Sequence, residues 1–512
     1  MMQFEHSANP CFPLEASKSL VIEQEGPLSP SPTPPASPIP PVTSMEDLKK
    51  PTITIQVTPM SPPPSPTMPE LESRSELVGH DTSSKPVAPP PYEPRPVVAV
   101  IGVGYVGTHL VEAFAHHFPV IAFDLSERRL LQVAEQLNHL SIRFTSSASD
   151  IAQASHFLVS VPTLLNVDKT IDTTYLRSAI STVEKYARPG STIVIESSVA
   201  VGMTRSLVGP LMNSKKFLVG MSPERVDPGR AEPAFESIPK IISGLDQASV
   251  DSISALYGLV FANLLPVTSP EVAEMTKLYE NCQRMVCAAY ANEMADACKA
   301  LGIDAFEVSA AAASKPFGYL PFRPGPGIGG HCIPVNPYYL LSTCEMPLLE
   351  KATTMSWQRP ANITKHFMKS LIRAEDCVER GRMAVDRLRI LVVGAGFKRG
   401  QSVLSNSPGA AIVCELLSEY DTYVEFADPL VDAEQMGHVP KMDTEIDWNQ
   451  EYLERFNGII VAVDQVGLDM SLLDRLQGVK IEDYSGRRRR AYTGNLPVPT
   501  SLFSDRAQKI SV

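Results

Sequence analysis

A short stretch near residue 100 restricts the fold more than any other part of the sequence. An apolar run, Val97–Gly102, is followed by a glycine-rich turn, a segment of helical length and a second apolar run, Val120–Asp124. Further strand-like runs follow near Phe157–Val161 and Thr192–Glu196. Strands that alternate with helices are typical of a parallel, doubly wound sheet, because the crossover helices cover its faces. The sequence therefore predicts an α/β domain that begins at Pro96.

The glycine-rich turn carries the pattern Gly102-x-Gly104-x-x-Gly107. Glycine is needed because the turn is tight and the backbone must come close to a pyrophosphate at the N-terminus of the next helix. The pattern alone is common, but here it lies between a strand and a helix. Asp124 ends the next strand, where an acidic side chain can bind a ribose 2′-hydroxyl and repel a 2′-phosphate. The expected cofactor is therefore NAD rather than NADP.

A second α/β unit is expected from Arg387 onward. It contains the strand-like runs Leu388–Val393, Tyr423–Ala427 and Gly458–Val463, with a helix at Ala410–Leu417. From about Pro270, between the two units, apolar side chains recur at helical spacing and form a stripe; they are Met275, Leu278, Cys282, Met285, Val286 and Ala289. The predicted fold class is α/β, with two doubly wound Rossmann-like domains joined by a long central helix.

The expected domain boundaries begin with a proline-rich tail at residues 1–95. The NAD-binding domain is expected at 96–265, a central helical domain with a cysteine loop at 266–385, a C-terminal α/β domain at 386–492 and a second tail at 493–512. Of 46 prolines, 23 lie in the first 96 residues. Such a segment cannot bury enough apolar surface to fold, so disorder is predicted. It is either a solvating tail or a segment that contacts a kinase or a modular domain.

Composition narrows the classes of partner. The formal net charge of −12 gives no general attraction to nucleic acid or to an anionic membrane. No run approaches the ~20 apolar residues that span a bilayer, and the first residues do not resemble a secretory signal. Eight cysteines without framework spacing indicate a reducing compartment, so a cytoplasmic location is expected. The histidines and cysteines show no metal-ligand spacing, so no metal is expected.

The most informative loop runs from Pro324 to Pro337, with the sequence Pro-Gly-Pro-Gly-Ile-Gly-Gly-His-Cys-Ile-Pro-Val-Asn-Pro. A stretch so rich in glycine and proline forms a shaped loop that lets a ligand approach the backbone. Cys332 lies near its end, just before an expected helix whose amides could activate a thiol. From the residues alone, Cys332 is either a nucleophile or an inert buried thiol.

Several motifs together resemble the UDP-glucose/GDP-mannose dehydrogenase family. The cysteine loop is similar to the catalytic loop of that family, whose usual form is Gly-Gly-His-Cys-Ile-Pro-Val-Asp-Pro. The other matches follow in the family's order; they are Val161-Pro162-Thr163, Glu196-Ser197-Ser198-Val199, Ser222-Pro223-Glu224-Arg225-Val226 and Lys277-Leu-Tyr-Glu-Asn281. The segment from Lys315 to Pro324 looks most like the branch that acts on UDP-N-acetylhexosamines. The resemblance covers about Pro96 to Arg490.

This resemblance implies a reaction and a set of residues. Cys332 would attack the C6 aldehyde made by the first hydride transfer, Lys277 and Asn281 would stabilise the oxyanion, and Glu224 would assist hydrolysis of a thioester. Asn336 completes the expected catalytic set. Further NAD contacts are expected from Val106, Arg129, Thr163 and Glu196, beside Gly102, Gly104, Gly107 and Asp124. The nucleotide sugar is expected to contact Glu224, Arg225, Lys277, Asn281, Arg323, Gly329, Phe397 and Lys398, in a homodimer joined through the central helices.

The sequence departs from the family at two places. Asn336 stands where the family has aspartate, and Ser405 and Asn406 stand where it usually has Arg-Glu. Asn336 followed by Pro337 is expected to be a helix N-cap, which asparagine fills as well as aspartate does. The amide cannot take a proton from water, and the lost arginine is a lost ligand for the substrate. An active dehydrogenase and a weakened nucleotide-sugar binder or partner subunit both remain open, as do UDP-glucose and GDP-mannose as substrates.

Overall fold

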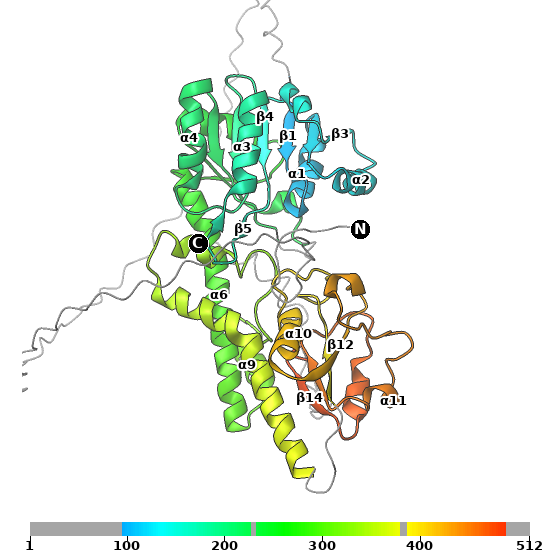
Figure 1. The fold of residues 1–512 in the computed structure, drawn as a ribbon. Helices are drawn as coiled ribbons and strands as arrows, with labels where there is room; N and C mark the ends of the chain where they lie inside the picture. The colour runs from blue at the N-terminus through cyan, green and yellow to red at the C-terminus, as the bar shows by residue number, and fades with distance from the viewer. Residues whose placement is uncertain (1–94, 227–231, 379–386, 488–512) are drawn as a thin grey trace, which may run out of the picture. The chain divides into compact units, whose positions relative to one another are not determined.

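The computed structural model describes residues 95–226, 232–378 and 387–487 (Figure 1). The expected tails at 1–95 and 493–512 therefore lie outside the described residues, apart from Arg95. The described chain contains two α/β units and a helical segment between them in sequence, so the predicted fold class is confirmed.

The N-terminal unit is built on a sheet with strand order β10-β9-β8-β7-β4-β1-β2-β3. Its strands are β1 (Val98–Ile101), β2 (Val120–Phe123), β3 (Ile142–Thr145), β4 (His156–Val159), β7 (Thr192–Ile195), β8 (Leu218–Met221), β9 (Lys240–Gly244) and β10 (Leu264–Pro266). Neighbouring strands are parallel except for β8 and β9, which are antiparallel. Parallel neighbours need a crossover, usually a helix, whereas the described part of the β8–β9 connection contains only the 3₁₀ turn Phe235–Ser237. The expected parallel sheet is therefore confirmed except at this one antiparallel pair.

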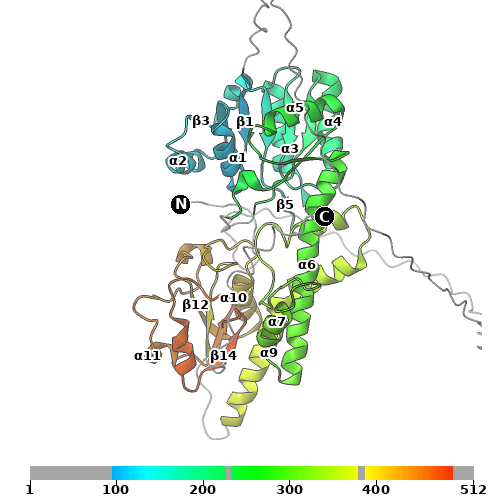
Figure 2. The same cartoon turned by 180° about the vertical axis from the view of Figure 1, so that it is seen from behind.

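Alternate residues of each central strand point into two separate cores, as a doubly wound sheet requires. Ala99 and Ile101 of β1 pack with α3 (Thr174–Tyr186) and α4 (Met203–Lys215). Val98 and Val100 pack on the other face with α1 (Tyr105–Ala115), α2 (Glu127–Gln136) and α5 (Gln247–Tyr257). Figure 1 shows α3 in front of the sheet, and Figure 2 shows α5 in front of it from behind. A small antiparallel hairpin, β5 (Leu164–Leu165) and β6 (Ile171–Asp172), follows β4.

Two long helices follow the N-terminal sheet in sequence, where only one was expected. The first, α6, runs from Pro270 to Leu301 and has Ser269 as its N-cap, proline in its first turn and a left-handed glycine at its end, Gly302. The second, α9, runs from Pro347 to Val378 and packs against α6. Two shorter helices lie between them in sequence, α7 (Ala305–Ala313) and α8 (Asn336–Leu341). The predicted apolar stripe of α6 packs in a core with α8: Leu278, Cys282 and Met285 are buried there, with Met275 and Val286 beside them.

The C-terminal unit has a parallel sheet in the order β12-β11-β13-β14. Its elements are β11 (Leu388–Val393), α10 (Pro408–Glu419), β12 (Thr422–Ala427), α11 (Gln450–Leu453), β13 (Gly458–Val461) and β14 (Lys480–Asp483). α10 and residues of α9 such as Phe367 cover one face of the sheet. No helix within the described ranges is long and apolar enough to cross a membrane. The cytoplasmic location stays a prediction.

Candidate active site

The glycine-rich loop after β1 has the shape that a pyrophosphate requires. Gly102 has φ +90°, a left-handed conformation that favours glycine. A Cβ on Gly107 would lie 1.9 Å from the Gly102 carbonyl oxygen, so glycine is needed for α1 to pack this close to the strand. A Cβ on Gly104 would meet nothing within 4 Å, so this side of the loop is open to a ligand. The three glycines therefore serve three different needs of a dinucleotide loop.

Asp124 lies beside this loop at the carboxyl end of β2. Its Oδ2 accepts a hydrogen bond from the backbone N–H of Val103 at 2.7 Å, and its Oδ1 accepts one from Ser126 at 2.9 Å. The side chain is half-buried, and Gly104, the N-cap of α1, offers no side chain to cap the helix. The first N–H groups of α1 are thus not capped by a side chain, and an acidic group lies next to them. The uncapped helix N-terminus suits the pyrophosphate of NAD, and the acidic side chain suits its ribose 2′-hydroxyl.

Arg129 lies over the same loop. Its Nε donates to the Val103 carbonyl oxygen at 2.7 Å, and its Nη2 donates to Thr108 Oγ1 at 2.9 Å and to the Gly104 carbonyl at 3.3 Å. Partial burial lowers the pKa of Arg129, and Asp124 opposes that shift. Val106 packs against the core beneath the loop, and Thr163 is half-buried after β4. Their contacts with NAD stay predictions.

Glu196 lies at the end of β7 and is 1% exposed. Its Oε2 is 2.6 Å from the Nζ of Lys240, and its Oε1 accepts a hydrogen bond from Tyr257. Burial raises the pKa of Glu196, and the ammonium of Lys240 opposes that shift. Both carboxylate oxygens therefore have protein partners, which makes Glu196 a buried support. Its cofactor role stays a prediction.

Lys240 connects Glu196 to the Ser222-Pro223-Glu224 turn. Besides the carboxylate, its Nζ donates to the carbonyl oxygens of Ser222 at 3.4 Å and Pro223 at 3.3 Å. A lysine that is 3% exposed needs such partners, because an unpaired buried ammonium is costly. The ion pair of Lys240 with Glu196 therefore holds in place the turn that carries Glu224.

Glu224 and Lys277 form a second buried pair. Lys277 Nζ donates to the backbone carbonyl of Glu224 and lies 3.4 Å from its Oε2. Both residues are less than a tenth exposed. The other carboxylate oxygen, Oε1, is buried without a hydrogen-bond partner among the described residues. A buried carboxylate oxygen needs a donor, and a water or a substrate hydroxyl would satisfy it.

Asn281 lies one helical turn after Lys277 on α6 and is fully buried. Its Nδ2 donates to the Oδ1 of Asn336, and its Oδ1 accepts from Nη2 of Arg284. Asn336 is the first residue of α8 and not its N-cap, which is Val335. The expected capping role of Asn336 is therefore wrong, because its side-chain oxygen is bound by Asn281 instead.

Cys332 comes one turn before Asn336. Its carbonyl oxygen accepts hydrogen bonds from the backbone N–H groups of Val335 at 3.2 Å and Asn336 at 2.9 Å. The residue is half-buried. The turn that begins α8 thus connects Cys332 to Asn336, which Asn281 of α6 binds.

The glycines before Cys332 are held by the C-terminal unit. Phe397 packs directly on them, since a Cβ on Gly329 would lie 2.7 Å from the Cβ of Phe397. The Gly330 N–H donates to the Ser405 carbonyl at 2.8 Å, and its carbonyl accepts from Asn406 Nδ2 at 2.9 Å. Ser405 Oγ is also 2.8 Å from His331 Nε2, and partial desolvation lowers the pKa of His331. Ser405 therefore binds the cysteine loop through both its backbone and its side chain.

Two parts of the chain match known protein domains. Residues 97–260 match the NAD-binding domain of the UDP-glucose/GDP-mannose dehydrogenase family, and residues 271–360 match its central domain. A UDP-N-acetyl-D-glucosamine 6-dehydrogenase of Pseudomonas aeruginosa is 32% identical over 366 residues, which cover 67% of this chain and 84% of that protein. The chain belongs to the UDP-glucose/GDP-mannose dehydrogenase family.

Other relatives agree with this assignment. A UDP-N-acetyl-D-mannosamine dehydrogenase of Methanococcus maripaludis is 28% identical over 65% of this chain and 80% of that protein. The solved structure of a UDP-D-ManNAc dehydrogenase from Pyrococcus horikoshii has the same fold, with a TM-score of 0.68 at 24% identity over 78% of this chain and 97% of that one. The predicted family, the NAD cofactor and the class of NAD-dependent nucleotide-sugar dehydrogenase are confirmed.

The other residues that were expected to contact the nucleotide sugar lie less close together. Arg225 pairs with Glu280 of α6 at 2.5 Å. Arg323 and Lys398 are exposed. Their contacts with a nucleotide sugar stay predictions. The sequence prediction missed Lys240 and Arg284, although Arg284 lies seven residues after Lys277 and so on the same helix face.

Proposed function

We propose that the chain oxidises the C6 alcohol of a UDP-N-acetylhexosamine to the carboxylate, with Cys332 as the covalent nucleophile. NAD accepts a hydride in each of two steps, so two NAD are reduced per sugar. After the first, the Cys332 thiolate adds to the C6 aldehyde; after the second, the adduct is a thioester. Water then cleaves the carbon–sulfur bond, which releases the uronate and returns the thiol.

The hydrogen-bonded group around Lys277 carries this proposal. Lys277 and Asn281 lie on one buried face of α6, and they contact Glu224 and Asn336, which come from separate segments. In this proposal, Lys277 and Asn281 are the hydrogen-bond donors that stabilise an oxyanion at C6. The Oε1 of Glu224, buried without a partner among the described residues, is suited to hold the water that attacks the thioester.

A screen of nucleotide sugars tests the substrate. Purified full-length protein with NAD is expected to form NADH fastest with UDP-N-acetylglucosamine or UDP-N-acetylmannosamine, because relatives named as dehydrogenases of these two sugars are 32% and 28% identical to this chain. UDP-glucose and GDP-mannose are the comparison substrates. Sugar binding without NADH from any of the four would instead favour a non-catalytic binder, the alternative that Asn336 and Ser405 raise.

Replacing the nucleophile tests the covalent mechanism. Cys332→Ala is expected to lower turnover by ~10³-fold or more while the nucleotide sugar still binds. Cys344→Ala, at another half-buried cysteine downstream of the same loop, is the matched control and should keep activity. Unchanged turnover in Cys332→Ala would exclude the thioester.

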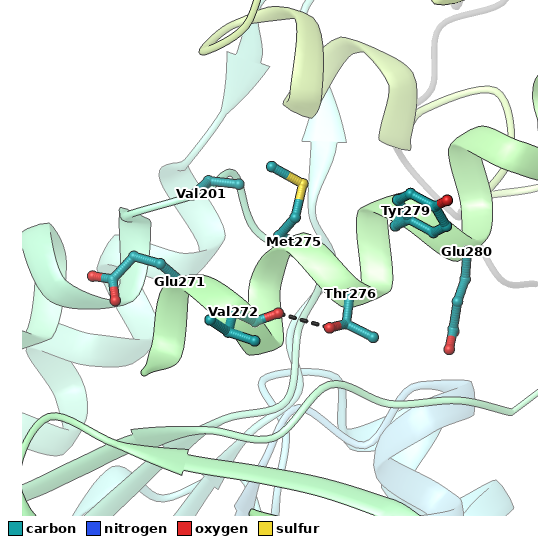
Figure 3. A pocket seen from close by; sticks show the side chains of 7 residues that line it. All are labelled: Val201, Glu271, Val272, Met275, Thr276, Tyr279 and Glu280. Carbon is teal, nitrogen blue, oxygen red and sulfur yellow. Dashed lines mark hydrogen bonds between the residues drawn. The ribbon is translucent and has the colours of Figure 1, made fainter. Parts of the chain in front are cut away.

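An exposed face of α6 supports the proposed homodimer. Val272, Tyr279, Tyr290 and Met294 recur at helical spacing and are 41%, 70%, 61% and 42% exposed. Figure 3 shows part of this face, where Val272, Met275 and Tyr279 line a cavity of about 570 Å³. A second copy of α6 would bury these side chains.

Light scattering on the eluting protein tests the homodimer. The double variant Tyr279→Glu/Tyr290→Glu is expected to elute as a monomer, because it places two charges in the proposed interface. Leu131→Glu on α2, at a side chain that is 72% exposed, is the control and should leave a dimer intact. A parent protein that is itself monomeric would contradict the proposal.

A further inference from the structure

Arg284 is a cation beside the candidate active site that forms no ion pair with a carboxylate in the part of the chain that the structure describes. It lies on α6, three residues after Asn281, and is half-buried. The other cations near it have acidic partners, since Lys277 pairs with Glu224 and Arg225 with Glu280. The guanidinium of Arg284 instead donates to the neutral amide oxygen of Asn281.

This contact fixes the direction of two amides. Arginine has donors and no acceptor, so the atom of Asn281 that faces Arg284 must be its oxygen. The amide nitrogen of Asn281 then faces Asn336 and donates to its Oδ1. The NH₂ group of Asn336 is left to donate elsewhere, and among the described residues it makes no hydrogen bond.

We infer that Arg284 is a positioning residue that makes Asn336 a hydrogen-bond donor towards the negative charge that forms at the Cys332 loop. Asn336 lies one helical turn after Cys332, a separation at which Cβ atoms are ~5–6 Å apart. A charge-assisted hydrogen bond polarises the next bond in a chain, so the Arg284 cation strengthens the donor at the far end. An aspartate at 336 would keep the bond from Asn281 but present an acceptor instead.

The inference rests on the proposed nucleophile Cys332, and it changes the meaning of the departure from the family. The exchange of aspartate for asparagine removes a base, but it supplies N–H groups for a thiolate or for the oxygen of the tetrahedral adduct. In this interpretation, the asparagine at position 336 takes a new role as a hydrogen-bond donor, and the site does not lose its function.

Four variants test the inference by two independent measurements. The variants are Arg284→Met, Arg284→Lys, Asn336→Asp and Asn336→Leu, each checked for folding by thermal melting. The first measurement is the rate at which iodoacetamide alkylates Cys332, followed by peptide mass spectrometry with Cys344 as internal reference; it needs no turnover. The second is kcat and KM for NADH formation.

We expect Arg284→Met and Asn336→Leu to slow alkylation of Cys332 at pH 7 by about tenfold and to lower kcat on the order of 10²-fold, with KM for NAD unchanged. Arg284→Lys should retain most of the alkylation rate and most of kcat, because lysine keeps the positive charge. Asn336→Asp should melt like the parent but react and turn over more slowly. Equal alkylation in Arg284→Met and the parent, with Asn336→Asp as fast as the parent or faster, would overturn the inference. An inactive parent that still shows the alkylation pattern would count against the proposed reaction alone.

Discussion

The two α/β units use the same turn geometry after their first strand but fill it differently. Gly102 and Gly394 both have positive φ, and each N–H donates to the last residue of the neighbouring strand at 2.9 Å. A Cβ on Gly107 would lie 1.9 Å from the Gly102 carbonyl, and one on Gly409 would lie 2.3 Å from the Gly394 carbonyl. In each unit, a glycine in the first helix thus packs directly on the glycine of the preceding turn.

The loops between these glycines differ in length. The second loop is ten residues longer, and its own chain occupies the space near the turn. Phe397 N–H donates to the Val403 carbonyl at 3.0 Å, and Gly400 N–H donates to Gln465 Oε1 at 2.7 Å. The short loop therefore keeps its backbone open for a cofactor, whereas the long loop holds the glycines before Cys332.

The acidic residues that follow the second strands show the same contrast. Asp124 is half-buried, and Asp428 is fully buried. Asp428 accepts from Gly396 N–H at 2.9 Å and from Gln465 Nε2 at 3.3 Å. Both acids thus bind their own loop, but only Asp124 is exposed enough to contact a ligand as well.

The largest expected effect comes from the packed glycines. Gly107→Ala and Gly409→Ala should each destabilise the protein by more than ~3 kcal/mol, because the added methyl group overlaps a backbone oxygen that cannot move easily. Gly104→Ala adds the same methyl group in open space and should melt within a few degrees of the parent. Urea unfolding of the three variants checks this, and equal stabilities would refute the shared geometry.

A second effect separates binding from folding in the first unit. Gly104→Ala should weaken NAD binding by ~10- to ~100-fold, the equivalent of the ~1–3 kcal/mol that overpacking costs. Gly400→Ala, at a glycine of the C-terminal loop with nothing within 4 Å of its Cβ, is the counterpart; its φ of +75° means that alanine strains the backbone there, but NAD affinity should stay unchanged. Isothermal titration with NAD measures both; unimpaired NAD binding by Gly104→Ala would show that the open space is not the cofactor's.

Local sequence patterns predicted much of the fold. Strands such as Leu388–Val393 and the glycine turn at Gly102 follow from apolar runs and turn residues, which are local properties. The helix α9 was missed because Pro360 lies inside it, and proline ordinarily argues against a helix interior. The direction of β9 was missed because strand pairing depends on distant segments.

The site was predicted less completely, for a similar reason. Lys277, Asn281 and Glu224 were found by motif, and the structure brings Lys277 to Glu224. Lys240 has a role only because Glu196, 44 residues earlier, is folded against it. Asn336 was misread as a cap because Asn281, 55 residues earlier, binds its side chain. Such pairings are set by tertiary packing and leave no local signal.

The smallest expected effect contrasts the two acidic residues. Asp124→Asn should lower the preference for NAD over NADP by about tenfold, or ~1.4 kcal/mol, because the charge that repels a 2′-phosphate is lost while an oxygen remains for Val103 N–H. Asp428→Asn should leave cofactor preference unchanged and cost ~1–3 kcal/mol of stability, since a buried acceptor of several hydrogen bonds is replaced by an amide. Kinetics with NAD and with NADP measure the cofactor preference of both variants, and urea unfolding measures their stability. If Asp428→Asn altered the cofactor preference, or if Asp124→Asn changed only stability, the proposed difference between the two acids would be wrong.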